Sequence, residues 1–363
     1  MTEELSRTSA LASRHTALGS GLEDWNGMGT AWTYNTDPND EHDAVREAVG
    51  MFDMSPLKKV FVRGPDAAAT LDHLTTRDIS KIAPGSAAYL CVLTEKGGMA
   101  DDAIVSNNGD DEWMIIHGSG DTMALLEASA VGCDVKVEFT DDLHDLSVQG
   151  PKSCDLLNTH CDINLPDLAY FQHAAAILFG HPCRLSRTGY SGEQGYEIFV
   201  DAAVIGDIWD KLVDKGVMPC SFTALDKVRI EAGLLFYGYD MTESNTPWEV
   251  GLGFAVSKNQ GDFRGKDAAM AAKGNEAIRN VCLDIDRSDM VAGGEALSLE
   301  GADVGIINSP CYSHRMGKSL ALAHINPNIK VGTVLKVTGD GIDTTATVVS
   351  SPIYDPSKSR THA

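Results

Sequence analysis

The chain has 363 residues, of which 43% are hydrophobic and 22% charged, so it has the composition of a globular protein with two or three packed units. Its 52 acidic residues against 29 basic ones give a formal net charge of −23, which argues against nucleic acid or an anionic membrane as a partner. No apolar run approaches the roughly 20 residues of a membrane span. The start lacks the pattern of a secretory signal, and we expect a cytoplasmic protein.

The first part of the chain predicts alternating helices and strands. Helical spacing occurs at residues 40–49, 67–74 and 121–130, and Asp66 is the expected cap of the second of these helices. Strand patterns occur at residues 59–62, 87–94, 99–106, 113–117 and 146–149. The segment 95–98 contains two glycines and predicts the turn of a β-hairpin between the strands 87–94 and 99–106.

A second round of similar elements follows and then gives way to short strands. Helices are predicted at 152–157, 204–215 and 224–236, and strands at 174–179, 183–186 and 196–200. Beyond residue 275 the pattern predicts strands at 280–285, 304–307, 320–323 and 334–337. The fold class is therefore α+β, with two related α+β units and a separate β-rich domain at the C-terminal end.

Cysteine and histidine spacing gives no sign of a metal centre. The eight cysteines are scattered without a Cys-x-x-Cys pair and are expected to be reduced thiols. His42, His73, His117, His144 and His314 lack partners at helical or strand metal spacing. We expect no metal cofactor.

The predicted hairpin carries two adjacent carboxylates. Strand alternation places Asp101 and Asp102 on opposite faces, so they cannot share a pocket. One of them could face a cavity while the other is solvated, or both could be ordinary acids near a turn. Alternation alone does not choose between these possibilities.

The segment 187–199 is rich in glycine and ends in a strand that carries Glu197 and Phe199 on one face. A carboxylate among apolar neighbours suits the planar, two-donor edge of an amidine-like ligand, and the alternative is a solvent-facing glutamate on an edge strand. No Gly-Lys-Ser/Thr and no Gly-x-Gly-x-x-Gly that enters a helix is present, which argues against a nucleotide site.

Three aromatic residues near the start, Trp25, Trp32 and Tyr34, could hold a methylated ammonium or sulfonium group by cation–π attraction, although core packing is their alternative role. Farther along, Asp226 and Arg229 are spaced as a helical i,i+3 pair, which is ordinarily a surface ion pair.

The order of the motifs closely resembles the aminomethyltransferase family, which includes the glycine-cleavage T-protein. The resemblance covers nearly the whole chain. The matching segments are Asp40-Glu41-His42-Asp43-Ala44-Val45-Arg46, Gly50-Met51-Phe52-Asp53-Met54-Ser55, Gly97-Gly98-Met99-Ala100-Asp101-Asp102, Val148-Gln149-Gly150-Pro151, Thr188-Gly189-Tyr190-Ser191-Gly192-Glu193-Gln194-Gly195-Tyr196-Glu197, Arg229-Ile230-Glu231-Ala232-Gly233, Asp262-Phe263-Arg264-Gly265-Lys266 and Gly332-Thr333.

The resemblance implies a three-domain cloverleaf ring whose central funnel holds tetrahydrofolate. The expected domains are 1–53 plus 146–230, 54–145 plus 231–275, and 276–363, the last barrel-like. By position, Asp102 matches the family's catalytic aspartate and Glu197 its pterin-gripping glutamate. The remaining residues expected at the folate site are Leu57, Tyr89, Ile116 and Tyr190.

Departures from the T-protein pattern at Pro56, Leu57, Met114 and Leu225 make the chain more similar to the branch of folate-dependent demethylases, such as dimethylsulfoniopropionate demethylase. The implied function is transfer of a methyl group from a small ammonium or sulfonium substrate to tetrahydrofolate, with Trp32 and Tyr34 as donor-binding candidates.

Two alternative functions remain open at this point. One is a T-protein that accepts an aminomethyl group from a lipoyl carrier protein. The other is a non-catalytic folate-binding protein, although the cysteine of that group's Lys-Gly-Cys-Tyr signature is missing at the corresponding segment 187–190.

Overall fold

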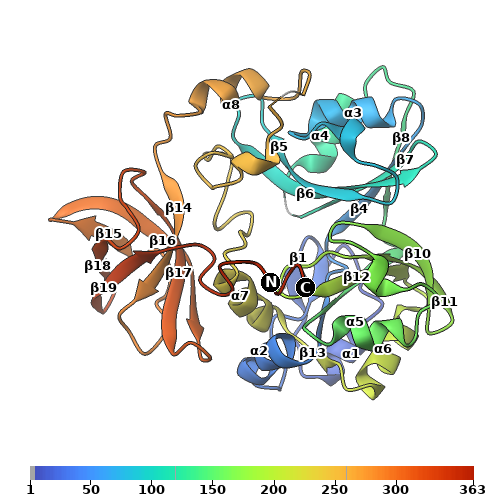
Figure 1. Ribbon diagram of the computed structural model, residues 1–363, viewed down its shortest axis with the longest axis horizontal. Helices are drawn as coiled ribbons and strands as arrows, with labels where there is room; N and C mark the ends of the chain where they lie inside the picture. The colour runs from blue at the N-terminus through green and yellow to red at the C-terminus, as the bar shows by residue number, and fades with distance from the viewer. Residues whose placement is uncertain (1–4, 119, 259) are drawn as a thin grey trace.

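The computed structural model describes residues 5–118, 120–258 and 260–363, and Figure 1 shows three folded units arranged around the middle of the molecule. The helices are α1 (Ala12–Ala17), α2 (Pro38–Glu47), α3 (Ala67–Leu74), α4 (Thr122–Ser129), α5 (Ser153–Asn158), α6 (Ile205–Asp214), α7 (Phe222–Glu231) and α8 (Lys266–Ala272), with short 3₁₀ turns at Ile79–Lys81, Leu165–Asp167 and Gly253–Ala255. No described helix has the length and apolar character needed to cross a membrane.

The strands form a two-stranded ribbon, two open sheets and one barrel. The ribbon pairs β1 (Glu23–Trp25) with β2 (Met28–Thr30). The six-stranded sheet has the order β10 (His173–Leu178), β11 (His181–Ser186), β12 (Gly195–Asp201), β9 (Leu143–Gln149), β3 (Gly50–Asp53) and β13 (Met218–Pro219). The five-stranded sheet has the order β5 (Ala87–Leu93), β6 (Met99–Gly109), β7 (Glu112–His117), β4 (Lys58–Arg63) and β8 (Lys136–Thr140). The closed barrel runs β14 (Arg279–Ile285), β17 (Lys318–Ile325), β16 (Ala302–Ser313), β15 (Ala296–Leu299), β18 (Val334–Gly339) and β19 (Ile342–Val349).

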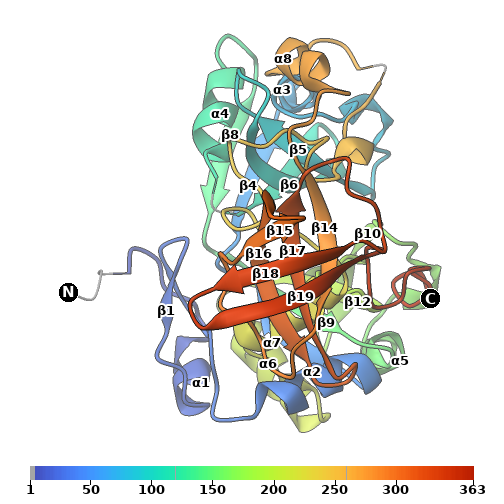
Figure 2. The same cartoon turned by 90° about the vertical axis from the view of Figure 1, so that its left-hand side faces the viewer.

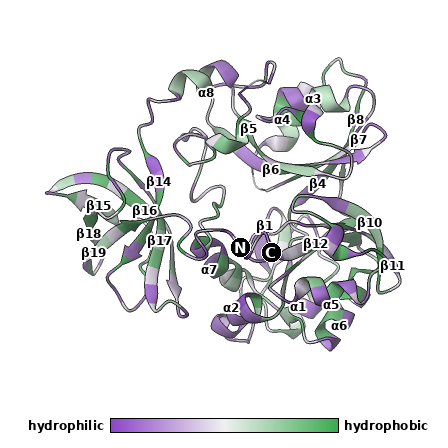
Figure 3. Ribbon diagram, in the orientation of Figure 1, coloured by the Kyte–Doolittle hydropathy of each residue, from purple (hydrophilic) through white to green (hydrophobic). Residues whose placement is uncertain are grey.

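In the six-stranded sheet, strand β12 is buried along almost its whole length because both of its faces are covered. Ile198 and Val200 face a core that α6 completes with Trp209, and Figure 3 shows hydrophobic stretches on α5 and α6 beside this sheet. By alternation, Glu197 and Phe199 project from the opposite face. The strand thus holds a carboxylate on the side away from the helices.

In the five-stranded sheet, too, one face is covered by helices and the other face can carry a carboxylate toward a ligand. Ala103 and Val105 of β6 pack into a core with Leu71 of α3 and Leu126 of α4. Asp101 lies on this helix-covered side of β6, so Asp102 points away from the helices. The sheet therefore fixes which of the two neighbouring aspartates can reach a ligand.

The barrel is joined to the rest of the molecule through α7. Ile230 of α7 packs against a cluster on the barrel that includes Cys282, Cys311 and Leu320, and Figure 2 shows the barrel strands in front of α7 and α2. After β19 the chain returns to the unit built on the six-stranded sheet, which we call the first unit. There Arg360 pairs with Glu193 at 2.8 Å.

The α+β class and the C-terminal β-rich domain are confirmed by these sheets, but two local predictions are wrong and one holds only in part. The helix predicted over 224–236 ends at Glu231 because Gly233 has a φ of 65°, which is outside the helical range. Asp66 occupies the N-cap position of α3 as predicted, but its side chain makes no capping hydrogen bond and accepts instead from the backbone N–H of Asp134 at 2.7 Å. Arg229 is buried rather than exposed, because its guanidinium pairs with Asp240 at 2.6 Å as well as with Asp226. The residue boundaries of the three domains stay a prediction.

Candidate functional site

Asp102 projects from β6 beside the aromatic residue on the neighbouring strand. The hydroxyl of Tyr89 donates a hydrogen bond to Asp102 Oδ2 at 2.9 Å. Burial, together with the neighbouring Asp101 carboxylate, raises the pKa of Asp102 to about 7. Near neutral pH this carboxyl group can therefore both release and accept a proton, as a general acid–base residue must.

Asp101 has a different environment. One of the two sequence-based interpretations allowed it to be solvated, but the structure buries it. Its carboxylate is fully buried and accepts hydrogen bonds from Thr122 Oγ1 at 2.9 Å and the N–H of Gly120 at 3.1 Å, and it bonds to Nδ1 of His117 at 3.0 Å. These contacts tie β6 to the end of β7 and the start of α4. Asp101 thus has a structural role in the unit that carries Asp102.

Glu197 is only 8% exposed, and the hydroxyl of Thr188 donates to its Oε2. Burial raises the pKa of Glu197. Phe199, on the same face of β12, packs in a cluster with Met114 and Ile116 of β7. A buried carboxylate beside an apolar wall suits a flat heterocycle that presents N–H donors on one edge, as the pterin of tetrahydrofolate does.

The remaining predicted folate-site residues lie around these two carboxylates. Leu57 packs against the same apolar cluster as Ile116. The hydroxyl of Tyr190 donates a hydrogen bond to the carbonyl of Leu235. Burial is the main cause that raises the pKa of Tyr190, and the Asp102 carboxylate adds to this increase, which shows that the two groups lie near each other.

The two donor-binding candidates are not brought together by the fold. Trp32 packs against the same hydrophobic cluster as Leu57 and Tyr190. Tyr34 instead bonds through its hydroxyl to Nδ1 of His15 at 2.7 Å and stacks on that ring. Only Trp32 shares a cluster with residues predicted to bind folate.

Phe254 is a site candidate that the sequence did not suggest. Its ring stacks on Tyr89 with centroids 6.3 Å apart, yet it is 66% exposed. A large apolar ring left open to solvent beside the Tyr89–Asp102 pair is suited to cover a bound ligand. It lies in a short 3₁₀ turn, Gly253–Ala255, whose sequence contains no recognisable motif.

Asp145 on β9 is the second residue that sequence reasoning missed. It is fully buried, and neither carboxylate oxygen has a hydrogen-bond partner among the described residues. It pairs across the strands with Phe199, which places it diagonally from Glu197 on the same face of the sheet. Burial and the Glu197 carboxylate raise the pKa of Asp145 well above its usual range. Strand alternation over 143–149 could have placed Asp145 on the Glu197 side.

Lys59 of β4 is a buried positive charge whose field acts on Asp145. Its ammonium is buried and donates to the carbonyls of Ser55 and Leu57, each at 2.7 Å. Burial lowers the pKa of Lys59 to about 8, against the opposing attraction of Asp145. The face of the six-stranded sheet that carries Glu197 therefore contains two buried acids, Lys59 of β4 in the five-stranded sheet adds one buried base, and the oxygens of Asp145 are left for a ligand.

We expect Asp145→Asn to stabilise the ligand-free protein more at pH 8 than at pH 5, by about 1–3 kcal/mol, because the raised pKa of Asp145 makes its ionisation increasingly costly as the pH rises and neither oxygen has a hydrogen-bond partner among the described residues. The folded-state pKa of Asp145 is raised, so the charge and its cost are present above that pKa and vanish as the group is protonated in acid. Urea unfolding of both proteins at pH 8 and pH 5 measures this. A variant that is less stable at pH 8 would show that the carboxylate is satisfied in the folded protein.

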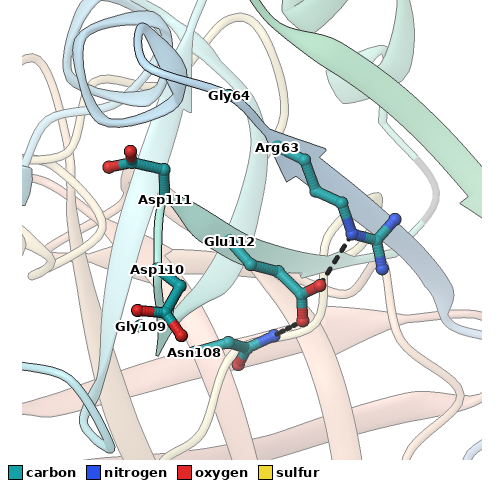
Figure 4. Close-up of a pocket in the computed structure, with 7 residues that line it drawn as sticks. All are labelled: Arg63, Gly64, Asn108, Gly109, Asp110, Asp111 and Glu112. Carbon is teal, nitrogen blue, oxygen red and sulfur yellow. Dashed lines mark hydrogen bonds and ion pairs between the residues drawn. The ribbon is translucent and has the colours of Figure 1, made fainter.

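A separate polar cavity of about 430 Å³ lies at the turn between β6 and β7 and is drawn in Figure 4. Its Glu112 accepts from Arg63 at 2.7 Å and from Asn108 at 2.9 Å, so its central charges already satisfy one another. None of the predicted site residues lines it. We therefore place the candidate site at Asp102 and Glu197 instead.

Comparison with known proteins covers both parts of the chain. The GCVT N-terminal domain matches residues 11–260, and the glycine cleavage T-protein C-terminal barrel domain matches residues 279–355. The heme-dependent oxidative N-demethylase gamma subunit of Ectopseudomonas mendocina (strain ymp) is 44% identical over an alignment of 368 positions, which includes 98% of this chain and 97% of that protein. An aminomethyltransferase of Herpetosiphon aurantiacus is 33% identical over 351 residues, or 95% and 97% of the two chains. The crystal structure of the glycine cleavage system aminomethyltransferase T from Bartonella henselae aligns with a TM-score of 0.89 at 26% identity, over 96% of this chain and 98% of that one.

Proposed function

The chain belongs to the glycine cleavage T-protein family of one-carbon transferases, and from this premise we propose that it transfers a methyl group from a small N-methylated cation to tetrahydrofolate. The observation that carries the proposal is the pairing of Tyr89 with an Asp102 whose pKa is about 7, in a fold that also offers a buried Glu197 for the pterin. The residues present fit this cofactor.

The folate side rests on complementary chemistry. Glu197 would accept two hydrogen bonds from the donor edge of the pterin, which a carboxylate does better than any neutral side chain. Leu57 and Ile116 would pack on the flat ring, and Tyr190 would border it. Asp145 offers further acceptor oxygens on the same face of the sheet.

The catalytic side rests on Asp102. When bound, tetrahydrofolate supplies the N5 nitrogen that accepts the methyl group. The C–N bond of the donor breaks with its electron pair left on the donor nitrogen, so a cationic donor leaves as a neutral amine. Asp102 would take the proton that N5 must lose, and Tyr89 would fix the orientation of the carboxylate. Alignment of the two reacting atoms can supply roughly 7–11 kcal/mol of the barrier reduction.

An N-methyl donor is favoured over a sulfonium donor by the relatives. The 44% identical protein is named as a subunit of an N-demethylase. The net charge of −23 is compatible with a cationic substrate.

We expect Trp32→Ala to raise the KM for a cationic donor by roughly 2- to 30-fold, which corresponds to the loss of one cation–π contact, while the folate Kd stays unchanged. Tyr34→Ala, the other predicted donor contact, should have the smaller effect because its hydroxyl is engaged by His15. Steady-state kinetics with the cation and a neutral isostere measure the contact. Equal KM changes for both compounds would argue against a cation-binding role.

A second candidate function is favoured by the word "oxidative" in that relative's name. In this version a partner subunit oxidises the methylated amine, and this chain passes a one-carbon unit at the oxidation level of formaldehyde to tetrahydrofolate. A T-protein activity would instead require a lipoyl carrier protein and release ammonia. A non-catalytic folate-binding role would give no folate product at all.

The functions are distinguished by incubating the purified protein with tetrahydrofolate and a panel of tetramethylammonium, betaine and sulfonium compounds. Formation of 5-methyltetrahydrofolate from the ammonium compounds is the expected result. Formation of 5,10-methylenetetrahydrofolate only when formaldehyde is supplied would favour the oxidative version. No product in either case would contradict both.

A further inference from the structure

Three potential metal ligands meet where the first unit touches the barrel. His42 and Asp43 lie on α2, and His314 follows β16 of the barrel. The two imidazole rings approach edge to face with centroids 4.8 Å apart. Sequence spacing gave no hint of this cluster because its members come from segments some 270 residues apart.

The ligand atoms are already close to the separation that one metal ion requires. Each of the three residues can present one ligand atom within 4.8 Å of the other two. Asp43 Oδ1 lies 3.1 Å from His314 Nε2 and 3.6 Å from His42 Nδ1. Two ligands bound to one tetrahedral Zn²⁺ at about 2.0–2.1 Å are roughly 3.3 Å apart. The two measured distances lie on either side of that value.

The imidazole of His42 is oriented as a metal ligand would be. Its Nε2 bonds to Oε2 of Glu231 at 2.9 Å, and this carboxylate also accepts from Arg46, so Nε2 carries the proton and Nδ1 carries a lone pair. That Nδ1 is buried and has no hydrogen-bond partner among the described residues. A carboxylate that holds the far nitrogen of a ligating histidine is the usual outer support of such a ligand.

Two features oppose a cation here: His314 Nε2 donates a hydrogen bond to Asp43 Oδ1 and must give up that proton to ligate a metal, and Arg315 also contacts Asp43. The Nη1 of Arg315 lies 2.9 Å from Asp43 Oδ1 and 2.6 Å from Glu47 Oε1. The side chain is 34% exposed and keeps Glu47 as a partner if it leaves Asp43. The guanidinium therefore competes with a metal ion for one oxygen without blocking the histidines.

We propose that His42, Asp43 and His314 form a binding site for a divalent transition-metal ion of the zinc class, which links α2 to the barrel. Water would complete the tetrahedral coordination. Because His42 and Asp43 come from α2 and His314 comes from the barrel, the bound ion stabilises the docking of the barrel on the first unit. This inference is independent of the proposed folate chemistry.

The test is calorimetric titration of the tag-free, metal-stripped full chain with ZnCl₂, together with thermal unfolding. We expect one Zn²⁺ per chain, a higher Tm with the metal, and roughly 100-fold weaker binding in His314→Ala. Arg315→Ala should bind more tightly because the competing cation is removed. With Co²⁺ the site should give a visible tetrahedral spectrum without a thiolate charge-transfer band, which excludes the cysteines.

A matched control is His181→Ala, because His181 and Asp207 form another partly exposed histidine–carboxylate pair, which belongs to no metal-like group among the described residues. This variant should bind Zn²⁺ like the wild type. His314 is 23% exposed, so its replacement should leave the fold intact, which circular dichroism verifies. Failure of the wild type to bind at 100 µM Zn²⁺, or equal affinity in His314→Ala, would overturn the proposal.

Discussion

Replacement of Asp102 by asparagine is expected to lower kcat by about 100-fold or more, while the folate Kd and the Tm remain nearly unchanged. Asparagine keeps the shape and can still accept the hydrogen bond from Tyr89, but it cannot take up a proton. Asparagine removes a charge whose burial raises the pKa of Asp102, so a large folding defect is unexpected. Single-turnover kinetics at saturating donor and folate measure the chemical step directly.

Asp101→Asn is the matched control, because the same substitution is made one residue away on the opposite face of β6. Its buried carboxylate accepts hydrogen bonds from Thr122 and Gly120, so we expect a loss of about 1–3 kcal/mol in stability. The folded protein should retain most of its turnover. The opposite ranking of the two variants would show that Asp102 has been given the wrong role.

The pH dependence of kcat/KM gives an independent check on Asp102. Its pKa is raised to about 7, so the carboxyl is protonated, and inactive as a base, below that value. Activity should therefore fall tenfold per pH unit below about pH 7 and level off above it. A profile that stays flat down to pH 5 would exclude a base with this pKa.

Glu197→Gln is expected to weaken folate binding by roughly 10- to 100-fold. A neutral amide offers one acceptor and one donor, whereas the pterin edge needs two acceptors. One N–H donor of the pterin would therefore face the NH₂ donor of the glutamine. Folding should survive because Gln can still accept from Thr188. Calorimetric titration with tetrahydrofolate measures the change.

The control for this variant is Glu295→Gln, the same substitution at a buried glutamate in the barrel. Glu295 is 4% exposed and accepts from the N–H groups of Ala292 and Gly293, away from the six-stranded sheet that carries Glu197. Its replacement should affect stability but not folate affinity. Equal folate affinity in Glu197→Gln and wild type would remove Glu197 from the site.

The sequence predicted most of the regular elements because their signals are local. The alternation around Asp102 and Glu197 placed each acid on a definite face of its strand, and the structure has those strands as β6 and β12. The prediction that helix α7 reaches residue 236 was wrong. The apolar periodicity continues past Gly233, but this glycine has a left-handed conformation that ends the helix.

Other features could not be predicted because they depend on long-range packing. Alternation left open which of Asp101 and Asp102 is buried, since that depends on where α3 and α4 dock. The stacking of Phe254 on Tyr89 joins segments about 165 residues apart. Asp145 was missed because the predicted strand, 146–149, begins one residue after it, whereas β9 begins at Leu143 and the surrounding strands bury Asp145.

The central claim is that this chain moves a methyl carbon from an N-methylated cation to tetrahydrofolate with Asp102 as the proton acceptor. The most direct measurement is mass spectrometry of the folate pool after incubation of wild type and Asp102→Asn with a donor whose methyl carbons are carbon-13. We predict labelled 5-methyltetrahydrofolate with the wild type and about 100-fold slower labelling with the variant. Unlabelled folate after complete saturation with the donor, or equal labelling rates in the two proteins, would contradict the account.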